Sequence, residues 1–197
     1  RYKNVLQRAL ANLSALEFED QVSLGEVCTV VHRAEMVSRI ASEIDLYICE
    51  LGTEGRLVSM QLEEVMADVE DEGFKVLKDY AVYADERQLE EIRDELAAAS
   101  PEDLLDNGLL LRILGYGPSA NPDTVVASRG YRILGRIPRL PAPVIDNLVR
   151  VFGNLQQVLA ASTEALDEVE GIGEVRARGI KEGLRRLKEQ VLLDRHM

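Results

Sequence analysis

Apolar side chains recur along the chain at the three- and four-residue spacing of amphipathic helices. Residues 5–16 carry such a stripe, and a longer one covers residues 24–44. Ser23 and Glu26 form a capping-box pattern at the start of the longer stripe, because each side chain can reach the other residue's backbone N–H. The pattern predicts two long helices, with a break near Ala34 as the alternative to one continuous second helix.

The same spacing predicts shorter helices through the rest of the chain. They are expected at residues 56–68, 74–83, 88–99, 104–114, 128–137, 144–152 and 154–161. The acidic run at residues 70–73 is expected to separate the first two of these helices. Sustained alternation of apolar and polar positions, the mark of a half-buried strand, does not occur. The predicted fold class is therefore all-α.

A run rich in glycine, proline and turn-forming residues divides this helical pattern. It covers residues 115–123, and such composition is typical of a connection between domains. The expected organisation is a helical linker (spine) domain at residues 1–114, a linker at 115–123 and a smaller helical domain at 124–197. The chain opens inside an expected helix, so we expect a piece of a longer protein.

The most informative stretch of the smaller domain is Val169-Glu170-Gly171-Ile172-Gly173. Its two glycines permit a tight turn between a short helix before it and a longer helix after it. Backbone N–H groups left unpaired at the start of that longer helix form a ready site for an anion such as phosphate. The pattern resembles the helix-hairpin-helix motif, which binds nucleic-acid phosphates through the backbone of its hairpin; a glycine helix cap in an ordinary bundle is the alternative.

An internal repeat supports this interpretation. A shift of 32 residues places Gly171-Ile172-Gly173 on Arg139-Leu140-Pro141, and the flanking apolar positions also match. Two such units resemble a double helix-hairpin-helix domain, similar to domain 2 of RuvA, although the first copy lacks both glycines. We expect the DNA-binding residues to be Gly171, Ile172, Gly173, Glu174, Val175, Arg176, Arg178 and Lys181 of the second copy, with Arg136 and Arg139 of the first.

The distribution of charge fits a nucleic-acid contact confined to the C-terminal third. The 197-residue chain has a net charge of −12, which is unusual for a DNA-binding protein. Residues 129–190 nevertheless hold eleven Lys and Arg against eight Asp and Glu, so that the acidic excess lies in the rest of the chain.

Composition argues against several other kinds of site. The two cysteines, Cys28 and Cys49, lie within helical patterns, and with only two histidines in the chain a metal site is not expected. Buried, reduced thiols in a cytoplasmic protein are the simpler interpretation. No run of apolar residues is long enough for a membrane span.

Three segments together resemble the family of DNA integrity scanning proteins, DisA. They are residues 24–56, the SPEDLLDNG sequence at 100–108 and the stretch from SRGYRILGRIPRLP to EGIG at 128–173. The resemblance covers nearly the whole chain. It implies a bacterial, cytoplasmic, nucleoid-associated protein in which a diadenylate cyclase domain precedes a helical linker and a double helix-hairpin-helix domain.

The family's cyclase makes cyclic di-AMP from ATP with Mg²⁺ or Mn²⁺, through an Asp-Gly-Ala and an Arg-His-Arg motif. Neither motif occurs in this chain. We therefore expect this part to be no enzyme and to hold no cofactor, with ATP and the metal belonging to a cyclase domain outside it. The implied partners are branched or junction DNA, the missing cyclase domain and, in the full-length protein, other copies of itself.

Three functions remain open at this stage. The first is the DNA-sensing part of a DNA integrity scanning protein, which conveys DNA binding to the absent cyclase domain. The second is an accessory subunit for repair or recombination, which would require an acidic metal-binding site if it were a nuclease. The third is a protein-interaction module that keeps the fold without binding DNA. Salt-dependent binding of a branched duplex separates the first two from the third.

Overall fold

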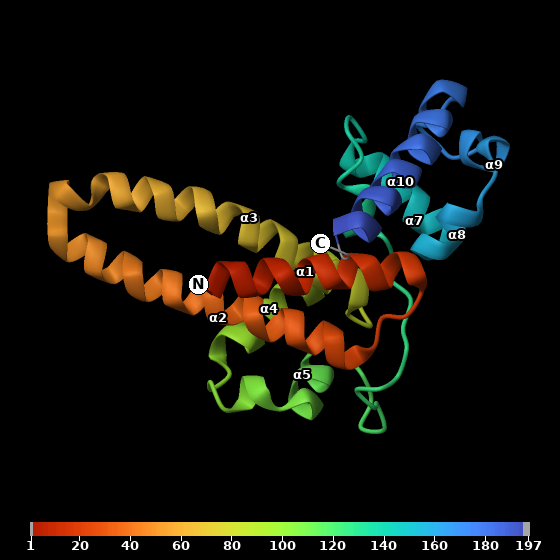
Figure 1. Ribbon diagram of the computed structural model, residues 1–197. Helices are drawn as coiled ribbons and strands as arrows, with labels where there is room; N and C mark the ends of the chain where they lie inside the picture. The colour runs from red at the N-terminus through yellow and green to blue at the C-terminus, as the bar shows by residue number, and fades with distance from the viewer. Residues whose placement is uncertain (1, 195–197) are drawn as a thin grey trace.

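The computed structural model describes residues 2–194, apart from the side chains of residues 53 and 54 (Figure 1). The α-helices are α1 (Tyr2–Glu19), α2 (Leu24–Leu51), α3 (Arg56–Tyr80), α4 (Glu86–Ala98), α5 (Asn107–Ile113), α6 (Tyr131–Leu134), α7 (Ala142–Phe152), α8 (Leu155–Ala160), α9 (Thr163–Asp167) and α10 (Glu174–Asp194). Two 3₁₀ helices, η1 (Gly52–Gly55) and η2 (Asp103–Leu105), complete the described elements. The predicted all-α fold class is confirmed, and no described helix is long and apolar enough to cross a membrane.

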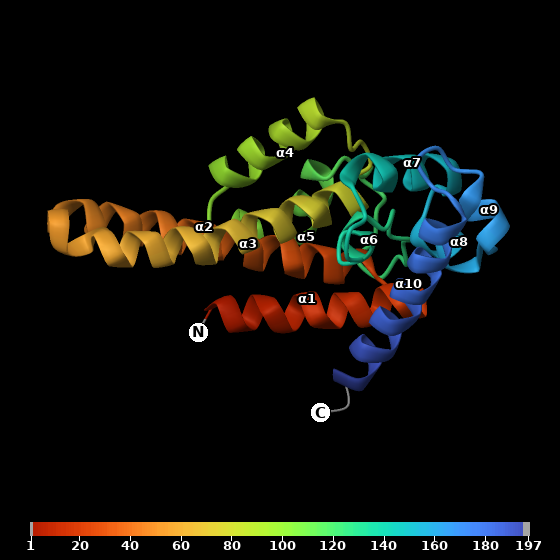
Figure 2. The ribbon, with the colours of Figure 1, turned by 90° about the horizontal axis from the view of Figure 1, so that it is seen from above.

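Helices α2 and α3 form a long hairpin that projects away from the other helices (Figures 1 and 2). The capping box is confirmed: the backbone N–H of Glu26 donates to Ser23 Oγ at 3.3 Å, and that of Ser23 donates to Glu26 Oε2 at 2.9 Å. Helix α2 continues without a break through Ala34. It turns at η1, where the sequence places two glycines.

The prediction of two separate helices at residues 56–68 and 74–83 is wrong, because α3 continues without a break through the acidic residues between them. Val69 and Val76 lie seven residues apart on its buried face, which keeps the helical register through the charged residues on the outer side. Gly73 lies within this continuous helix and faces α2, since a Cβ at this position would lie 3.7 Å from the Ala34 Cβ.

Two other helices are shorter than the sequence predicts. The segment expected to form one helix at 104–114 starts as η2 and begins again as α5, because the Asp106 side chain accepts hydrogen bonds from the backbone N–H groups of Gly108 and Leu109. The helix expected at 128–137 is reduced to α6, which ends before Gly135 and Pro138. Helices α4, α7 and α8 lie close to their expected ranges.

Two hydrophobic cores organise the molecule, and α1 contributes to both. The first core joins α1 to α5, while the second joins α6 to α10 and also includes Ala15 and Phe18 of α1. The segment predicted as a linker, 115–123, and the residues just after it are bound to the start of α2. The N–H groups of Leu24 and Gly25 donate to Thr124 O at 2.9 Å and Pro122 O at 2.7 Å.

Candidate nucleic-acid interface

The two units of the internal repeat have matching backbone geometry. Helices α6 and α7 and the turn between them lie 32 residues before α9, α10 and their turn. In the first turn the N–H of Leu140 donates to Ile137 O at 3.4 Å, and in the second the N–H of Ile172 donates to Val169 O at 2.9 Å. The same register that relates the two sequences therefore relates the hydrogen bonds of the two turns.

A left-handed residue stands at the same place in each turn. Gly171 has φ = 84°, and Arg139, its counterpart in the first copy, has φ = 61°. A Cβ on Gly171 would lie 3.2 Å from Val144 Cγ2 of α7, so this glycine serves both the turn and its packing. By contrast, a Cβ on Gly173 would meet nothing within 4 Å and φ there is not left-handed, so a side chain at Gly173 does not strain the turn.

The second turn presents a group of unpaired backbone donors. Ile172 is buried and anchors the turn, whereas the residues on both sides of it are exposed. Within the described part of the chain, no acceptor is found for the N–H groups of Gly171, Gly173, Glu174, Val175 and Arg176. These donors surround the N-terminus of α10, where the helix dipole also favours an anion.

The first turn is much poorer in donors, because three of its residues are prolines. Pro138, Pro141 and Pro143 have no backbone N–H, and the last two correspond to Gly173 and Val175 of the second turn. The two turns therefore share a shape but differ in chemistry: only the second can surround an anion with several backbone donors.

The predicted cationic residues of the second unit fall into two groups. Arg176 and Arg178 are exposed; Arg176 donates to Gly171 O, and Arg178 forms an ion pair with Glu174 one turn earlier. Lys181 instead donates from Nζ to Leu159 O at 3.0 Å and Ala161 O at 2.7 Å, so it fixes the C-terminal end of α8. Arg176 and Arg178 thus lie close to the free N–H groups, whereas Lys181 has a structural role as well as a charge.

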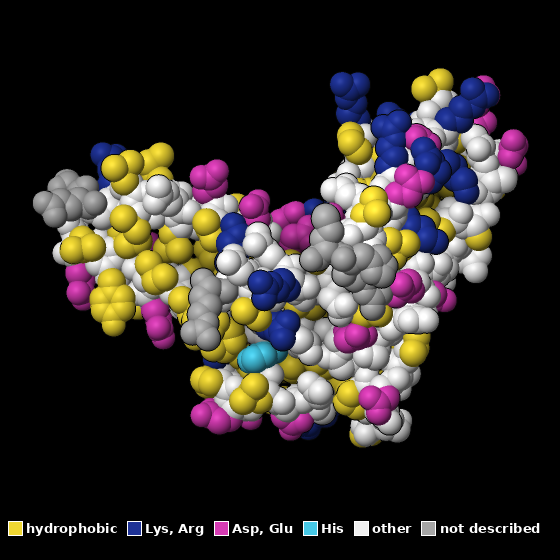
Figure 3. Space-filling model, viewed as in Figure 1, with side chains coloured by type: hydrophobic (Ala, Val, Ile, Leu, Met, Phe, Trp, Pro, Cys, Tyr) yellow, Lys and Arg dark blue, Asp and Glu magenta, His cyan; other side chains and the backbone are white. Residues whose placement is uncertain are grey.

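A groove of about 800 Å³ beside α10 extends this basic surface. Arg178, Lys181, Arg185 and Lys188 line it, and Glu182 is the one carboxylate among its lining residues. Figure 3 shows Lys and Arg side chains gathered over this end of the molecule, above the position of α10 in Figure 1. The predicted site did not include Arg185 and Lys188. Their spacing in the sequence places them on the same face of α10 as Arg178 and Lys181, so this pattern could have indicated them.

The two predicted residues of the first unit, Arg136 and Arg139, are exposed. Arg136 reaches toward α1, where its Nη1 lies 3.5 Å from Ser14 Oγ. It lines a cavity of about 480 Å³ together with Arg8 and Arg132. Arg139 occupies the left-handed position of the first turn. Among the described residues no cluster of His, Cys, Asp or Glu has the arrangement of a metal site.

A buried polar junction, which the sequence did not reveal, joins the repeat units to the α2–α3 hairpin. Asp79, near the end of α3, accepts hydrogen bonds from the N–H groups of Gly130, Tyr131 and Arg132 at 2.9, 2.6 and 3.1 Å. The carboxylate thus caps the start of α6, where Gly130 at the N-cap position has no side chain to do so. Burial and the nearby Glu17 carboxylate raise the pKa of Asp79 to about 7.

Arg132 connects the same junction to α1. Its Nη2 lies 2.6 Å from Glu17 Oε2 and 2.9 Å from Ser14 Oγ, and Tyr80 donates its hydroxyl hydrogen to Glu17 Oε1 at 2.8 Å. Arg132 and Glu17 are almost completely buried, and burial raises the pKa of Glu17 above its usual range.

Arg129 completes the junction by donating to three carbonyl oxygens at the end of α3. These are the oxygens of Lys78, Ala81 and Val82, at 3.1, 2.7 and 3.1 Å. The sequence placed Arg129 and Arg132 only within an expected helix at residues 128–137, whereas their side chains bind the end of α3 and α1. Local sequence patterns could not predict these contacts, because the partners lie between 47 and 118 residues away in the sequence.

The fold and this interface define an all-helical protein in which an acidic helical hairpin is joined to a repeated helical unit with one basic end. Residues 1–122 match the family described as the DisA bacterial checkpoint controller linker region. The chain therefore belongs to the DisA linker family, as the sequence resemblance indicated.

Curated relatives extend the similarity over the repeated unit. The DNA integrity scanning protein DisA of Carboxydothermus hydrogenoformans is 54% identical over 191 residues, which cover 96% of this chain and 54% of the relative. The proteins of the same name from Symbiobacterium thermophilum and Bacillus subtilis are 53% and 47% identical, with 100% of this chain covered and 55% and 54% of the relatives. The chain thus spans about half the length of these relatives.

Proposed function

We propose that this chain is the DNA-sensing part of a DNA integrity scanning protein and binds the phosphate backbone of DNA through the turn between α9 and α10. The observation that carries the proposal is the group of five unpaired backbone N–H donors around Gly173, beside the exposed guanidinium groups of Arg176 and Arg178. Backbone donors recognise phosphate oxygens without reading bases, so the binding is independent of sequence.

The repeated unit supports a preference for branched DNA. Two similarly shaped turns can contact two strands at once, and a junction offers strands at more angles than a linear duplex. Because of its prolines, the first turn contributes through the charge of Arg139 rather than through backbone donors. We assign the dominant phosphate contact to the second turn and a weaker one to the first.

We further propose that DNA binding is conveyed to a diadenylate cyclase domain outside this chain. That domain would bind ATP and the metal ion, and the full-length protein would be an oligomer. The buried junction supports this coupling, because Asp79, Arg129 and Arg132 connect the repeat units directly to the ends of α1 and α3. A change in the orientation of α6 therefore displaces α3 rather than being absorbed by a flexible connection.

The test is DNA binding by the whole chain, measured by fluorescence anisotropy with a duplex, a single strand and a four-way junction at several salt concentrations. We expect binding that weakens with salt, with a slope of log K against log salt set by the number of phosphates contacted, and tightest binding to the junction. Absence of binding to all three DNAs at about 50 mM salt would refute the proposal and favour a protein-interaction module.

A further inference from the structure

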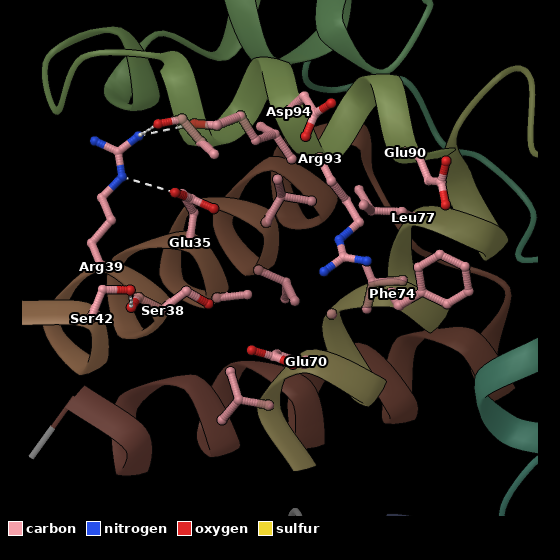
Figure 4. Close-up of a pocket in the computed structure, with 18 of the residues that line it drawn as sticks. Glu35, Ser38, Arg39, Ser42, Glu70, Phe74, Leu77, Glu90, Arg93 and Asp94 are labelled. Carbon is pink, nitrogen blue, oxygen red and sulfur yellow. Dashed lines mark hydrogen bonds and ion pairs between the residues drawn. The ribbon is translucent and has the colours of Figure 1, made fainter. Parts of the chain in front are cut away.

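A groove of about 870 Å³ lies between the α2–α3 hairpin and α4 (Figure 4). Helix α4 lies away from α10 (Figure 2). The floor of the groove is apolar, formed by side chains from all three helices. Those that matter most are Val31 of α2, Val69 and Leu77 of α3, and Leu96 of α4. A groove of this volume is in the range of sites that hold a ligand or a set of side chains from a partner.

Two arginines connect the helices on either side of the groove. Arg39 of α2 donates from Nη2 to Leu96 O and Ala99 O at the end of α4, at 2.9 and 2.7 Å, and from Nε to Glu35 Oε1 at 2.8 Å. From the opposite side, Arg93 of α4 extends toward α3 and lies 6.0 Å from the centre of the Phe74 ring, as Figure 4 shows. Because these contacts exist without a partner, docking requires little rearrangement of the groove.

The rim of the groove is acidic. Glu43 of α2, Glu70 of α3, and Glu90 and Asp94 of α4 are exposed, and none of them has a cationic partner in the described part of the chain. Figure 4 shows Glu70 on one side of the cavity and Glu90 and Asp94 on the other. Unpaired carboxylates on both sides of an apolar floor repel nucleic acid and anionic lipid and attract a cationic partner.

We propose that this groove docks a basic amphipathic helix of a partner protein. Apolar side chains at positions i, i+3, i+4 and i+7 of that helix contact the floor, and its Lys and Arg side chains pair with the carboxylates on both sides. Helix α4, with 13 residues, is about 20 Å long, which matches three to four turns of a bound helix. The chain thus has two oppositely charged surfaces, one for DNA and one for protein.

The experiment uses the whole chain and a fluorescein-labelled 14-residue helical peptide, with leucines at the four docking positions and lysine or arginine at most others. A second peptide of the same composition, with the leucines spread around the helix, controls for net charge. We expect micromolar binding of the first peptide and at least about tenfold weaker binding of the second, because only the first has an apolar face.

Two groove variants and one matched control test the location. Glu70→Lys/Asp94→Lys reverses charge on both sides of the groove, Ser38→Trp fills its mouth, and Glu63→Lys/Glu64→Lys makes the same charge change elsewhere on α3. Both groove variants should weaken binding at least about tenfold and the control less than about threefold, with far-UV circular dichroism and DNA binding unchanged.

Three results would overturn the proposal: equal binding of the two peptides, equal effects of the groove and control variants, or full binding by Ser38→Trp. A monomer–dimer equilibrium in sedimentation that Ser38→Trp abolishes would assign the groove to a second copy of this chain instead, and would overturn it too. None of these results depends on whether the opposite end of the molecule binds DNA.

Discussion

Replacement of Asp79 by alanine should loosen the buried junction between α3 and the repeat units. The carboxylate accepts three backbone hydrogen bonds, from Gly130, Tyr131 and Arg132, and is itself almost completely buried. Alanine leaves these donors without an acceptor and removes an anion from the surroundings of the Arg132 guanidinium. A buried donor that loses its partner costs about 1–3 kcal/mol.

The three donors are not independent, since a small shift of α6 can expose some of them to water. We therefore expect the free energy of unfolding to fall by about 3–5 kcal/mol, which is the lower part of the range for three unpaired donors at about 1–3 kcal/mol each. Asp79→Asn keeps one carbonyl oxygen as an acceptor and should cost less. Asp71→Ala is the matched control on the same helix, because its exposed ion pair with Lys75 contributes at most about 0.5 kcal/mol.

Urea denaturation followed by circular dichroism measures the overall loss. Native-state hydrogen exchange of the amides of residues 130–132 reports on the junction itself, because these are the N–H groups that Asp79 accepts. Asp79→Ala should make all three exchange faster while Asp71→Ala leaves them unchanged. A loss below about 1 kcal/mol together with unchanged protection of the three amides would refute the assignment of Asp79 as the cap of α6.

Three further predictions concern Lys181, the glycines of the second turn and the titration of Asp79. Lys181→Met removes the donor to two carbonyl oxygens at the end of α8 and should lower stability in urea by about 1–3 kcal/mol, whereas a purely DNA-binding role predicts no loss. Gly171→Ala should cost about 1–2 kcal/mol because φ is 84° there, while Gly173→Ala, at an open position, should cost less than about 0.5 kcal/mol in the same assay. The pKa of Asp79 is raised from 3.8 to about 7, so between these pH values the folded state holds a proton that the unfolded state has released. The free energy of unfolding should therefore fall as pH rises from about 4 to 7, and Asp79→Asn should flatten that dependence.

The sequence predicted the features that depend on local patterns. Apolar periodicity gave the fold class, Ser23 and Glu26 gave a helix start, and the 32-residue shift gave two units whose backbone hydrogen bonds match. The glycine-poor first copy was harder to interpret, because Arg139 adopts a left-handed conformation that the sequence alone did not indicate.

The features that sequence analysis missed depend on contacts between distant residues. The acidic run before Gly73 has the composition of a break, but burial of Val69 and Val76 against α2 keeps α3 continuous. Lys181 was expected at the DNA interface but also caps α8, and Arg132 is buried with Glu17, a contact that the sequence did not predict. The sequence gives the charge of such residues, whereas contacts in the folded chain determine which of them are free to bind a ligand.

The first repeat unit supplies the substitutions that test phosphate binding by the second turn most cleanly. Prolines already occupy the positions of Gly173 and Val175 in the first turn. The backbone there keeps two hydrogen bonds that match the second turn, Leu140 N–H to Ile137 O and Ile145 N–H to Pro141 O. The double variant Gly173→Pro/Val175→Pro therefore removes two N–H donors with little change in shape, and Val175 is 87% exposed, so little packing is lost. The reciprocal variant Pro141→Gly/Pro143→Val is the matched control.

The decisive measurement is the dissociation constant of a four-way junction for these two variants and the unmodified chain, at fixed salt and with circular dichroism to confirm folding. A hydrogen bond to a charged group contributes about 1.5–3 kcal/mol net, so the loss of one phosphate contact weakens binding about 10- to 150-fold, and the double-proline variant should bind at least about tenfold more weakly. The reciprocal variant should bind as tightly as the unmodified chain or more tightly. Unchanged affinity of the double-proline variant, or an equal loss in both variants, would contradict phosphate binding by the backbone of the second turn.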